Sequence, residues 1–271
     1  MSSKRVSAKP FPSYRNPPVI EVVCGLRFQP LEPFKIPHIG LFWTKVLSDF
    51  PNCEHAPPLS FGPETFDPSS GLPIPRIWLI NEKDNRLIQI QKDAFLYNWR
   101  KRSEDEPYPR YKSIIRPFKK YLNDFSKFLK EHKISPIVPI DCELTYINHI
   151  TVEHGWKPGS QVGKFLPDVW WRARRGRFLP RPATIVWRAR VPLPEDNGQL
   201  IIKLEQGTRK IDNVPILKLE LSARGLGADK TLKSVWNWFE VAHEWIVRGF
   251  ADLTSFEVQE RVWKRYDKST G

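Results

Sequence analysis

The chain has 271 residues, of which 40% are hydrophobic and 13% aromatic, so it can bury a real core and is not a disordered protein. Its three cysteines, Cys24, Cys53 and Cys142, have no tight spacing, which excludes a disulfide scaffold and favours a reducing compartment. No apolar run approaches the roughly 18–20 residues of a membrane span, and residues 1–10 contain no apolar signal-peptide core. We therefore expect a cytoplasmic protein without a membrane contact.

The net charge of +13 is concentrated in two stretches of the sequence. Residues 97–133 hold 11 Lys/Arg against 5 Asp/Glu, a net charge of +6, and residues 170–190 hold seven Arg and no acid, a net charge of +7. The rest of the chain is balanced, with 25 charges of each sign. Such a concentrated excess favours a polyanionic partner over a role in solubility alone.

The first half of the chain predicts strands and two helices after a flexible, proline-containing lead-in at residues 1–17. Pro117 lies inside the helix expected at 110–131, so that helix either kinks or begins at this residue. The expected elements follow from β-branched runs, three- and four-residue apolar spacing and turn residues. In order, they are a strand at 18–28, a helix at 38–50, a long loop at 51–75, two or three antiparallel strands at 77–80, 87–90 and 94–99, and a helix at 110–131.

The second half predicts elements in a similar order. Asp196, Asn197 and Gly198 form a good hairpin turn between two strands. Thr254 and Glu257 have the spacing of a capping box for a short final helix. The expected elements are a strand at 140–152, a short helix at 161–171, strands at 184–191, 200–204 and 216–221, and a long helix at 230–250.

These patterns predict an α+β fold in which antiparallel sheets are packed by long helices. Residues 18–133 and 134–271 both follow the order β-α-β-β-(β)-α, either as two units or as one continuous domain. Ile114 and Phe118 match Val235 and Phe239 at a constant offset of 121 residues. We interpret this agreement as an internal duplication.

Motifs for metal binding and catalysis are absent from the sequence. Cys53-x-His55 and His149-x4-His154 lack standard zinc spacing, and no nucleophile motif is present, so we expect no metal and no cofactor. The glycine-rich stretch at 225–231 is interpreted as a turn in which Asp229 caps a helix, rather than as a phosphate loop.

Glu21 and Glu143 occupy matched places in the two halves and are the candidate carboxylate pair. General acid–base catalysis would need them close together and desolvated. Glutamates that face solvent or form salt bridges are the simpler interpretation, so the sequence assigns no catalytic residue.

The strongest local signal is an arginine-rich, aromatic stretch that continues through Trp187-Arg188-Ala189-Arg190. Arginine makes bidentate contacts with phosphate, and interleaved aromatic rings stack on unpaired bases. The candidate binding residues of this stretch are Trp170, Trp171, Arg172, Arg174, Arg175, Arg177 and Arg181.

A second basic feature is the polar face of the helix predicted at 110–131. Such a face can follow a phosphate backbone without reading its sequence. It could equally be a solvated surface or the docking site of an acidic protein. Its candidate binding residues are Lys112, Arg116, Lys119 and Lys120.

The stretch from Tyr14 through Pro17-Pro18 and Glu21 to Phe28 resembles the start of a sporadically distributed family of uncharacterised prokaryotic proteins. Residues 250–254, with Trp263 beyond them, are similar to the end of the same family. The family has no agreed catalytic residues, so the resemblance implies no site. Its patchy distribution implies a horizontally exchanged accessory gene, as in defence or toxin–antitoxin loci.

The sequence therefore favours a non-enzymatic protein that binds nucleic acid through its basic, aromatic-rich stretches. The first alternative is an interaction or regulatory module that holds an acidic protein. The second is a small-ligand or enzymatic pocket between the sheet and a long helix.

Overall fold

Eleven strands and four α-helices make up the described chain, which confirms the α+β class. The computed structural model describes residues 11–59, 71, 75–156, 162–169, 171, 175–180, 182–209 and 212–268. The strands are β1 (Phe11–Tyr14), β2 (Val19–Phe28), β3 (Asn52–Ala56), β4 (Arg76–Ile80), β5 (Arg86–Gln91), β6 (Ala94–Arg100), β7 (Pro139–Ile150), β8 (Val186–Pro192), β9 (Gln199–Thr208), β10 (Pro215–Gly225) and β11 (Arg265–Lys268). The α-helices are α1 (Ile36–Val46), α2 (Lys112–Glu131), α3 (Leu232–Leu253) and α4 (Phe256–Arg261), and two short 3₁₀ turns lie at Val162–Lys164 and Pro194–Asp196.

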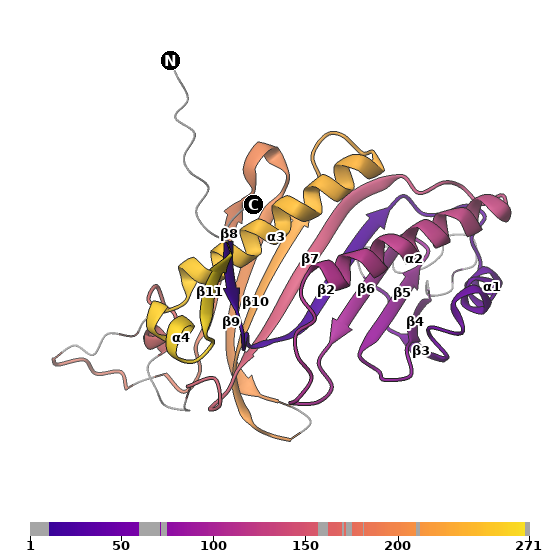
Figure 1. Cartoon of the computed structure of the whole chain (residues 1–271). Helices are drawn as coiled ribbons and strands as arrows, with labels where there is room; N and C mark the ends of the chain where they lie inside the picture. The colour runs from indigo at the N-terminus through magenta and orange to yellow at the C-terminus, as the bar shows by residue number, and fades with distance from the viewer. Residues whose placement is uncertain are drawn as a thin grey trace, which may run out of the picture.

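Nine of these strands form one antiparallel sheet in the order β3-β4-β5-β6-β2-β7-β10-β9-β8. The long helices α2 and α3 lie along one face of this sheet (Figure 1). β1 and β11 form a separate two-stranded sheet that joins the two ends of the described chain. The opposite face of the large sheet carries no helix in the described chain.

Aromatic rings fill the core between the sheet and the helices. The ring of Phe125 on α2 stacks on Phe95 of β6 at 5.2 Å and meets Phe42 of α1 edge-on at 5.1 Å. Phe118 contacts Phe239 of α3 at 5.3 Å, so the two long helices share this core. These residues lie at the three- and four-residue spacing that predicted the helices.

The strand order is symmetrical about the central pair β2–β7. Each half places its first strand at the centre and its last strand beside it, with the others outward. Val23 pairs with Thr145, 122 residues later, the same offset that relates Glu21 to Glu143. The topology has the order expected of a repeated unit, and the duplication itself stays a prediction.

Three local predictions are wrong. Residues 51–75 were expected to be a loop, but 52–56 form the edge strand β3. Of the helix expected at 161–171, the described residues 162–169 form only a 3₁₀ turn at Val162–Lys164, because Pro167 cannot continue an α-helix. Residues 1–10 of the expected lead-in lie outside the described residues, but residues 11–14 form β1, whose Tyr14 is buried and donates a hydrogen bond from its hydroxyl to Gln259 Oε1 at 3.0 Å.

Both predicted helix caps are also displaced. Thr231, not Asp229, caps α3, because its Oγ1 accepts from Ser234 N at 3.2 Å while Asp229 supports Thr231 N at 2.9 Å. Thr254 donates to the carbonyl oxygen of Phe250 at 2.6 Å instead of capping α4. Each predicted cap lies close to the observed end of its helix, where the boundary depends on a few side-chain hydrogen bonds.

No helix in the described part of the chain combines the length and apolar character needed to cross a membrane.

Gly198 is the residue whose lack of a side chain matters most to the second half. Its φ is +109°, and a Cβ there would overlap the carbonyl oxygen of Arg224 and lie 2.7 Å from Gly225 Cα. We expect Gly198→Ala to lower the free energy of unfolding by about 2–4 kcal/mol, measured by urea denaturation. Gly207→Ala is the control, because a Cβ at that residue would meet no atom within 4 Å. Equal urea midpoints for the two variants would contradict this account.

Candidate functional site

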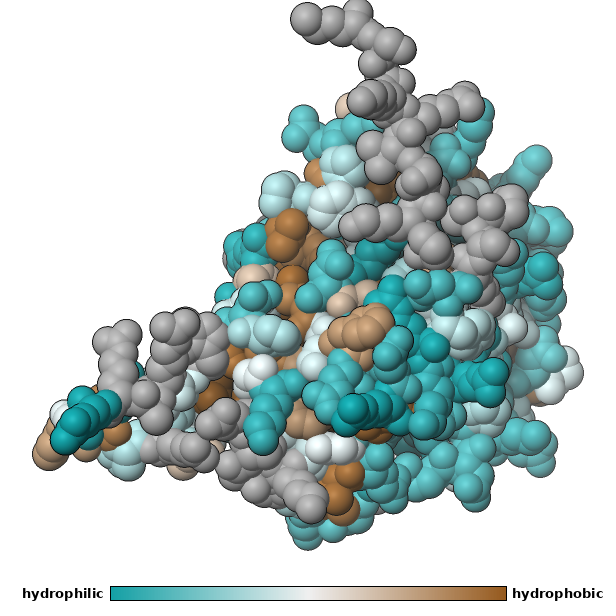
Figure 2. All heavy atoms as spheres, turned by 60° about the vertical axis from the view of Figure 1, so that its left-hand side comes forward, coloured by the Kyte–Doolittle hydropathy of each residue, from teal (hydrophilic) through white to brown (hydrophobic). Residues whose placement is uncertain are grey.

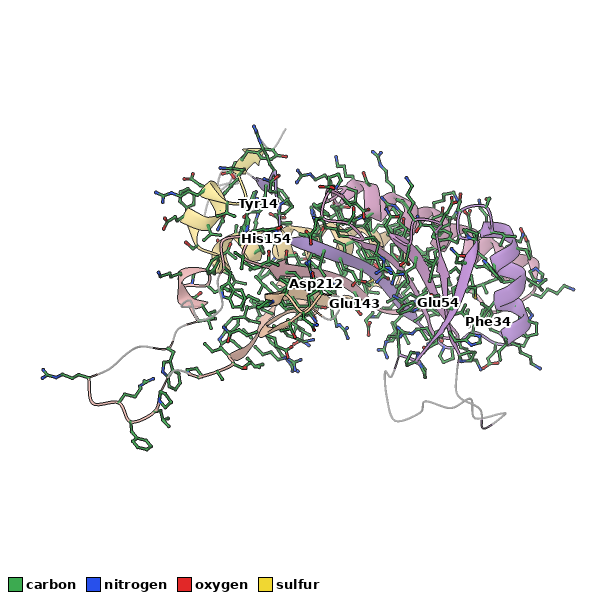
Figure 3. All side chains as sticks on the ribbon, turned by 90° about the horizontal axis from the view of Figure 1, so that it is seen from below. Tyr14, Phe34, Glu54, Glu143, His154 and Asp212 are labelled. Atoms are coloured by element: carbon green, nitrogen blue, oxygen red, sulfur yellow. The ribbon has the colours of Figure 1, made fainter. Side chains whose placement is uncertain are left out.

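An arginine-rich extension leads into the outermost strand of the sheet. We call the described residues 171, 175–180 and 182–192 the arginine arm. Its first part extends away from the body of the protein (Figure 3), and its second part includes the edge strand β8. The arm contains no acidic residue.

The first part of the arm exposes large apolar side chains next to arginines. Phe178 is 96% exposed, Leu179 59% and Trp171 39%. The guanidinium of Arg177 lies 4.2 Å from the centroid of the Trp171 ring, a cation–π contact. Hydrophilic and hydrophobic side chains lie together at the tip of this extension (Figure 2).

Successive side chains of strand β8 lie on opposite faces of the sheet. Trp187 and Ala189 pack against the core, whereas Arg188 and Arg190 are exposed on the helix-free face. Among the described residues, no carboxylate lies within 4.0 Å of Arg175, Arg188 or Arg190. These three guanidinium groups are therefore available to an anionic partner. Arg188 and Arg190 were not among the candidate binding residues, although their two-residue spacing in an expected strand places both side chains on one face.

The structure describes only part of the predicted stretch at 170–181. Trp171, Arg175 and Arg177 are present as above, and Trp171 and Arg177 lie in contact. The remaining candidates lie outside the described residues: Trp170, Arg172, Arg174 and Arg181.

The second basic feature, on α2, is separate from the arm. Lys112 and Arg116 are exposed, Lys119 lies 5.0 Å from the Trp236 ring, and Lys120 pairs with Asp124 at 3.3 Å and with Asp49 at 3.8 Å. Helix α2 lies over the first half of the sheet, whereas the arm lies beyond the second half (Figure 1). The two basic features do not form one continuous surface.

Glu21 and Glu143 both lie on the helix-free face but do not form a pair. In the β2–β7 register Glu21 is opposite Ile147, while Glu143 is opposite Gly25, four residues away along β2. Glu21 Oε1 accepts from Asn98 Nδ2 at 2.6 Å, and Glu143 pairs with Arg224 at 2.9 Å. Their separate partners give no support to joint acid–base catalysis.

Metal-binding groups are not found in the described ranges of the chain, where no group of three or more His, Cys, Asp or Glu could hold an ion. His154 Nδ1 instead lies 2.9 Å from Thr151 Oγ1. Cys53 and His55 both lie exposed on β3.

No protein-family model matches the chain, and a search of the curated proteins finds no match. The resemblance of residues 14–28 and 250–254 to an uncharacterised prokaryotic family therefore stays a prediction.

His149, on the helix-free face of β7, predicts an acid-sensitive stability. Burial, with the nearby Lys218 and Arg209, lowers its pKa to about 4. In the unfolded chain the imidazole has an ordinary pKa of about 6.5. As the pH falls, it therefore binds a proton at a higher pH in the unfolded chain than in the folded chain. The stability contributed by neutral His149 is present above about pH 6.5 and is lost as the pH falls towards 4.

We expect the free energy of unfolding to fall between pH 7 and pH 4.5 by about 1–2 kcal/mol more in the wild type than in His149→Phe. Urea denaturation across this pH range measures the difference. His55→Gln controls for the loss of one imidazole from the chain. Parallel pH curves for the wild type and His149→Phe would contradict the assignment.

Proposed function

We propose that the protein is a non-enzymatic binding protein that engages single-stranded nucleic acid through the arginine arm. The observation that carries this proposal is the set of exposed arginines in the arm, which has no acidic residue to neutralise them. Arg175, Arg188 and Arg190 supply charge for phosphates. Trp171 and Phe178 supply exposed ring faces beside them for unpaired bases.

The geometry of β8 supports contact with an extended strand rather than with a compact anion. Arg188 and Arg190 point to the same face and lie two positions apart, which is on the order of 7 Å along a strand. A row of cations with this separation can contact successive phosphates of one extended backbone. Base stacking on Trp171 or Phe178 requires unpaired bases, which favours single strands over a duplex.

An acidic protein is the second candidate partner, favoured by the apolar residues of the arm. Leu179 is 59% exposed and Val186 72% exposed, and neither side chain can stack on a base as a ring does. Exposed apolar groups together with tryptophan and arginine are typical of protein interfaces. In this candidate function, the rings anchor the interface and the arginines select a negatively charged surface.

A cytoplasmic location is part of this proposal. Cys24, Cys53 and Cys142 are free thiols, as expected in a reducing compartment. The resemblance to a patchily distributed prokaryotic family adds a defence or toxin–antitoxin setting to the proposal.

Fluorescence anisotropy of labelled oligo(dT) and oligo(U) tests the arm directly. If about three phosphates are neutralised, the logarithm of the association constant should fall with the logarithm of salt concentration with a slope of about −2. The triple variant R175E/R188E/R190E should weaken binding at least about tenfold at low salt, because it replaces three attractions with three repulsions.

The matched control is K112E/R116E/K127E, which makes the same change in net charge on the exposed face of α2. We expect this variant to keep most of the affinity. Salt-independent binding, no binding, or an equal loss in both triple variants would count against the proposal. An acidic protein that copurifies without nucleic acid, and is lost from the arm variant alone, would support the second candidate.

A further inference from the structure

A cavity of about 470 Å³ lies on the helix side of the sheet, beneath α3. Its walls come from β1, the start of β2, the segment at 108–112 that leads into α2, and from β7, β10 and α3. This volume is within the range of pockets that hold small ligands, about 300–1,000 Å³. The cavity does not include Glu21 or Glu143, which lie on the helix-free face.

Aromatic rings form a large part of the cavity wall. The ring of Tyr111 stacks on His243 with centroids 3.8 Å apart and planes at 8°, and Phe11 stacks on His243 at 5.3 Å. Tyr14 and Phe250 meet edge to face at 5.5 Å. Because aromatic rings pair with one another through offset or edge contacts, such a wall favours an aromatic ligand. The six Phe and Tyr rings that line the cavity are Phe11, Tyr14, Tyr108, Tyr111, Tyr146 and Phe250.

Two hydrogen-bonding groups in this wall are left without a full set of partners among the described residues. The hydroxyls of Tyr108 and Tyr146 are 2.9 Å apart, and one hydrogen bond between them uses only one of their two protons. The half-buried imidazole of His243 lies against the rings of Tyr111 and Phe11 and makes no hydrogen bond with any described residue. Burial lowers its pKa to about 3, so the neutral ring offers one N–H donor and one nitrogen acceptor at neutral pH.

The charged residues of the lining are on its more exposed parts and carry a net positive charge. They are Arg110, Lys112 and Glu240. Arg110 Nη1 donates to the carbonyl oxygen of Tyr14 at 2.8 Å, and the Tyr111 hydroxyl donates to Glu240 Oε1 at 3.3 Å. Two cations against one carboxylate disfavour a cationic ligand, even though tyrosine rings can form cages for cations.

Arg110 also explains how the segment at 108–112 presents two tyrosines to the same cavity. Its φ is +73°, in the left-handed region that a residue other than glycine rarely adopts. This turn lies between Tyr108 and Tyr111, and the bond from Arg110 to the Tyr14 carbonyl oxygen stabilises it. Strained backbone of this kind is frequent at ligand sites.

We propose that this cavity binds a small aromatic anion. The ring packs among the tyrosines, a polar substituent bonds to His243 or to the Tyr108–Tyr146 pair, and the anionic group lies near Arg110 and Lys112. This inference does not depend on nucleic-acid binding by the arm.

The test uses the full chain and the fluorescent aromatic anion 1-anilinonaphthalene-8-sulfonate, displaced by competitors of matched size. We expect 6-hydroxy-2-naphthoate to displace the probe from a single site. The cationic 2-naphthyltrimethylammonium and the aliphatic decanoate should compete at least about tenfold more weakly. Equal competition by all three, or stronger competition by the cation or the aliphatic chain, would overturn the proposed ligand class.

Two variants test whether the probe binds in the cavity. Ile246→Trp adds a large ring to the wall on α3 and should weaken probe binding at least about tenfold. Phe178→Ser removes the most exposed apolar side chain of the arm and should leave the affinity unchanged. Retained binding in Ile246→Trp, or lost binding in Phe178→Ser, would place the probe elsewhere and overturn the proposal.

His243→Phe tests the role of the imidazole without emptying the cavity. The wild type should prefer 6-hydroxy-2-naphthoate over 2-naphthoate, because the hydroxyl gains a buried partner. In His243→Phe or in Tyr146→Phe, the preference should fall by at least about threefold, while 2-naphthoate still binds. A hydroxyl preference that survives in both variants, or is absent from the wild type, would contradict the proposed contact.

Discussion

The pairing of β2 with β7 is the constraint on which the rest of the structure depends. These two strands come from different halves of the chain and form the centre of the nine-stranded sheet. Their register turns Val22, Cys24 and Leu26 towards the helices, opposite Tyr146, Leu144 and Cys142. A slip of one residue would turn these side chains to the helix-free face and expose them, so burial on one face fixes the register.

This register also determines which charged side chains form ion pairs. On the helix-free face it brings Arg27 next to Asp141, and Glu143 reaches Arg224 of β10 in the same row. The middle of that face is therefore largely neutralised by its own ion pairs. Within the described ranges, Arg188 and Arg190 of β8 and Lys112 and Arg116 of α2 are exposed, form no ion pair and lie away from this row. The concentration of charge in the sequence thus becomes two separate basic features rather than one continuous surface.

Patterns that repeat over many residues were predictable from the sequence. The apolar spacing of α2 and α3 and the β-branched runs of β8 and β10 predicted the right elements, because the burial of one side of a helix or strand repeats along it. Short elements were less predictable. β3 is a five-residue edge strand with only one partly buried residue, and it forms because it can pair with β4.

The arginine arm and the cavity also differ in how far the sequence could predict them. The arm is contiguous in the chain, so its composition alone marked Trp171, Arg175 and Arg177. The cavity is assembled from Tyr14, Tyr108, Tyr146 and His243, which lie far apart in the sequence and meet only because the two halves share one sheet. Each residue alone resembles an ordinary core aromatic. The imidazole of His243, which has no hydrogen-bond partner among the described residues, marks the site, and it becomes visible only once its neighbours are placed.

The arm and the cavity rely on opposite physical effects, which allows them to be distinguished on one protein. Binding at the arm depends on exposed charge, which salt screens over about 10 Å at 0.1 M. Binding in the cavity depends mainly on apolar burial among rings that are already desolvated, and excluded salts strengthen such burial. Only the part of cavity binding that comes from Arg110 and Lys112 should weaken with salt. A molecule with both sites would therefore release a polyanion at a salt concentration where it still holds an aromatic ligand.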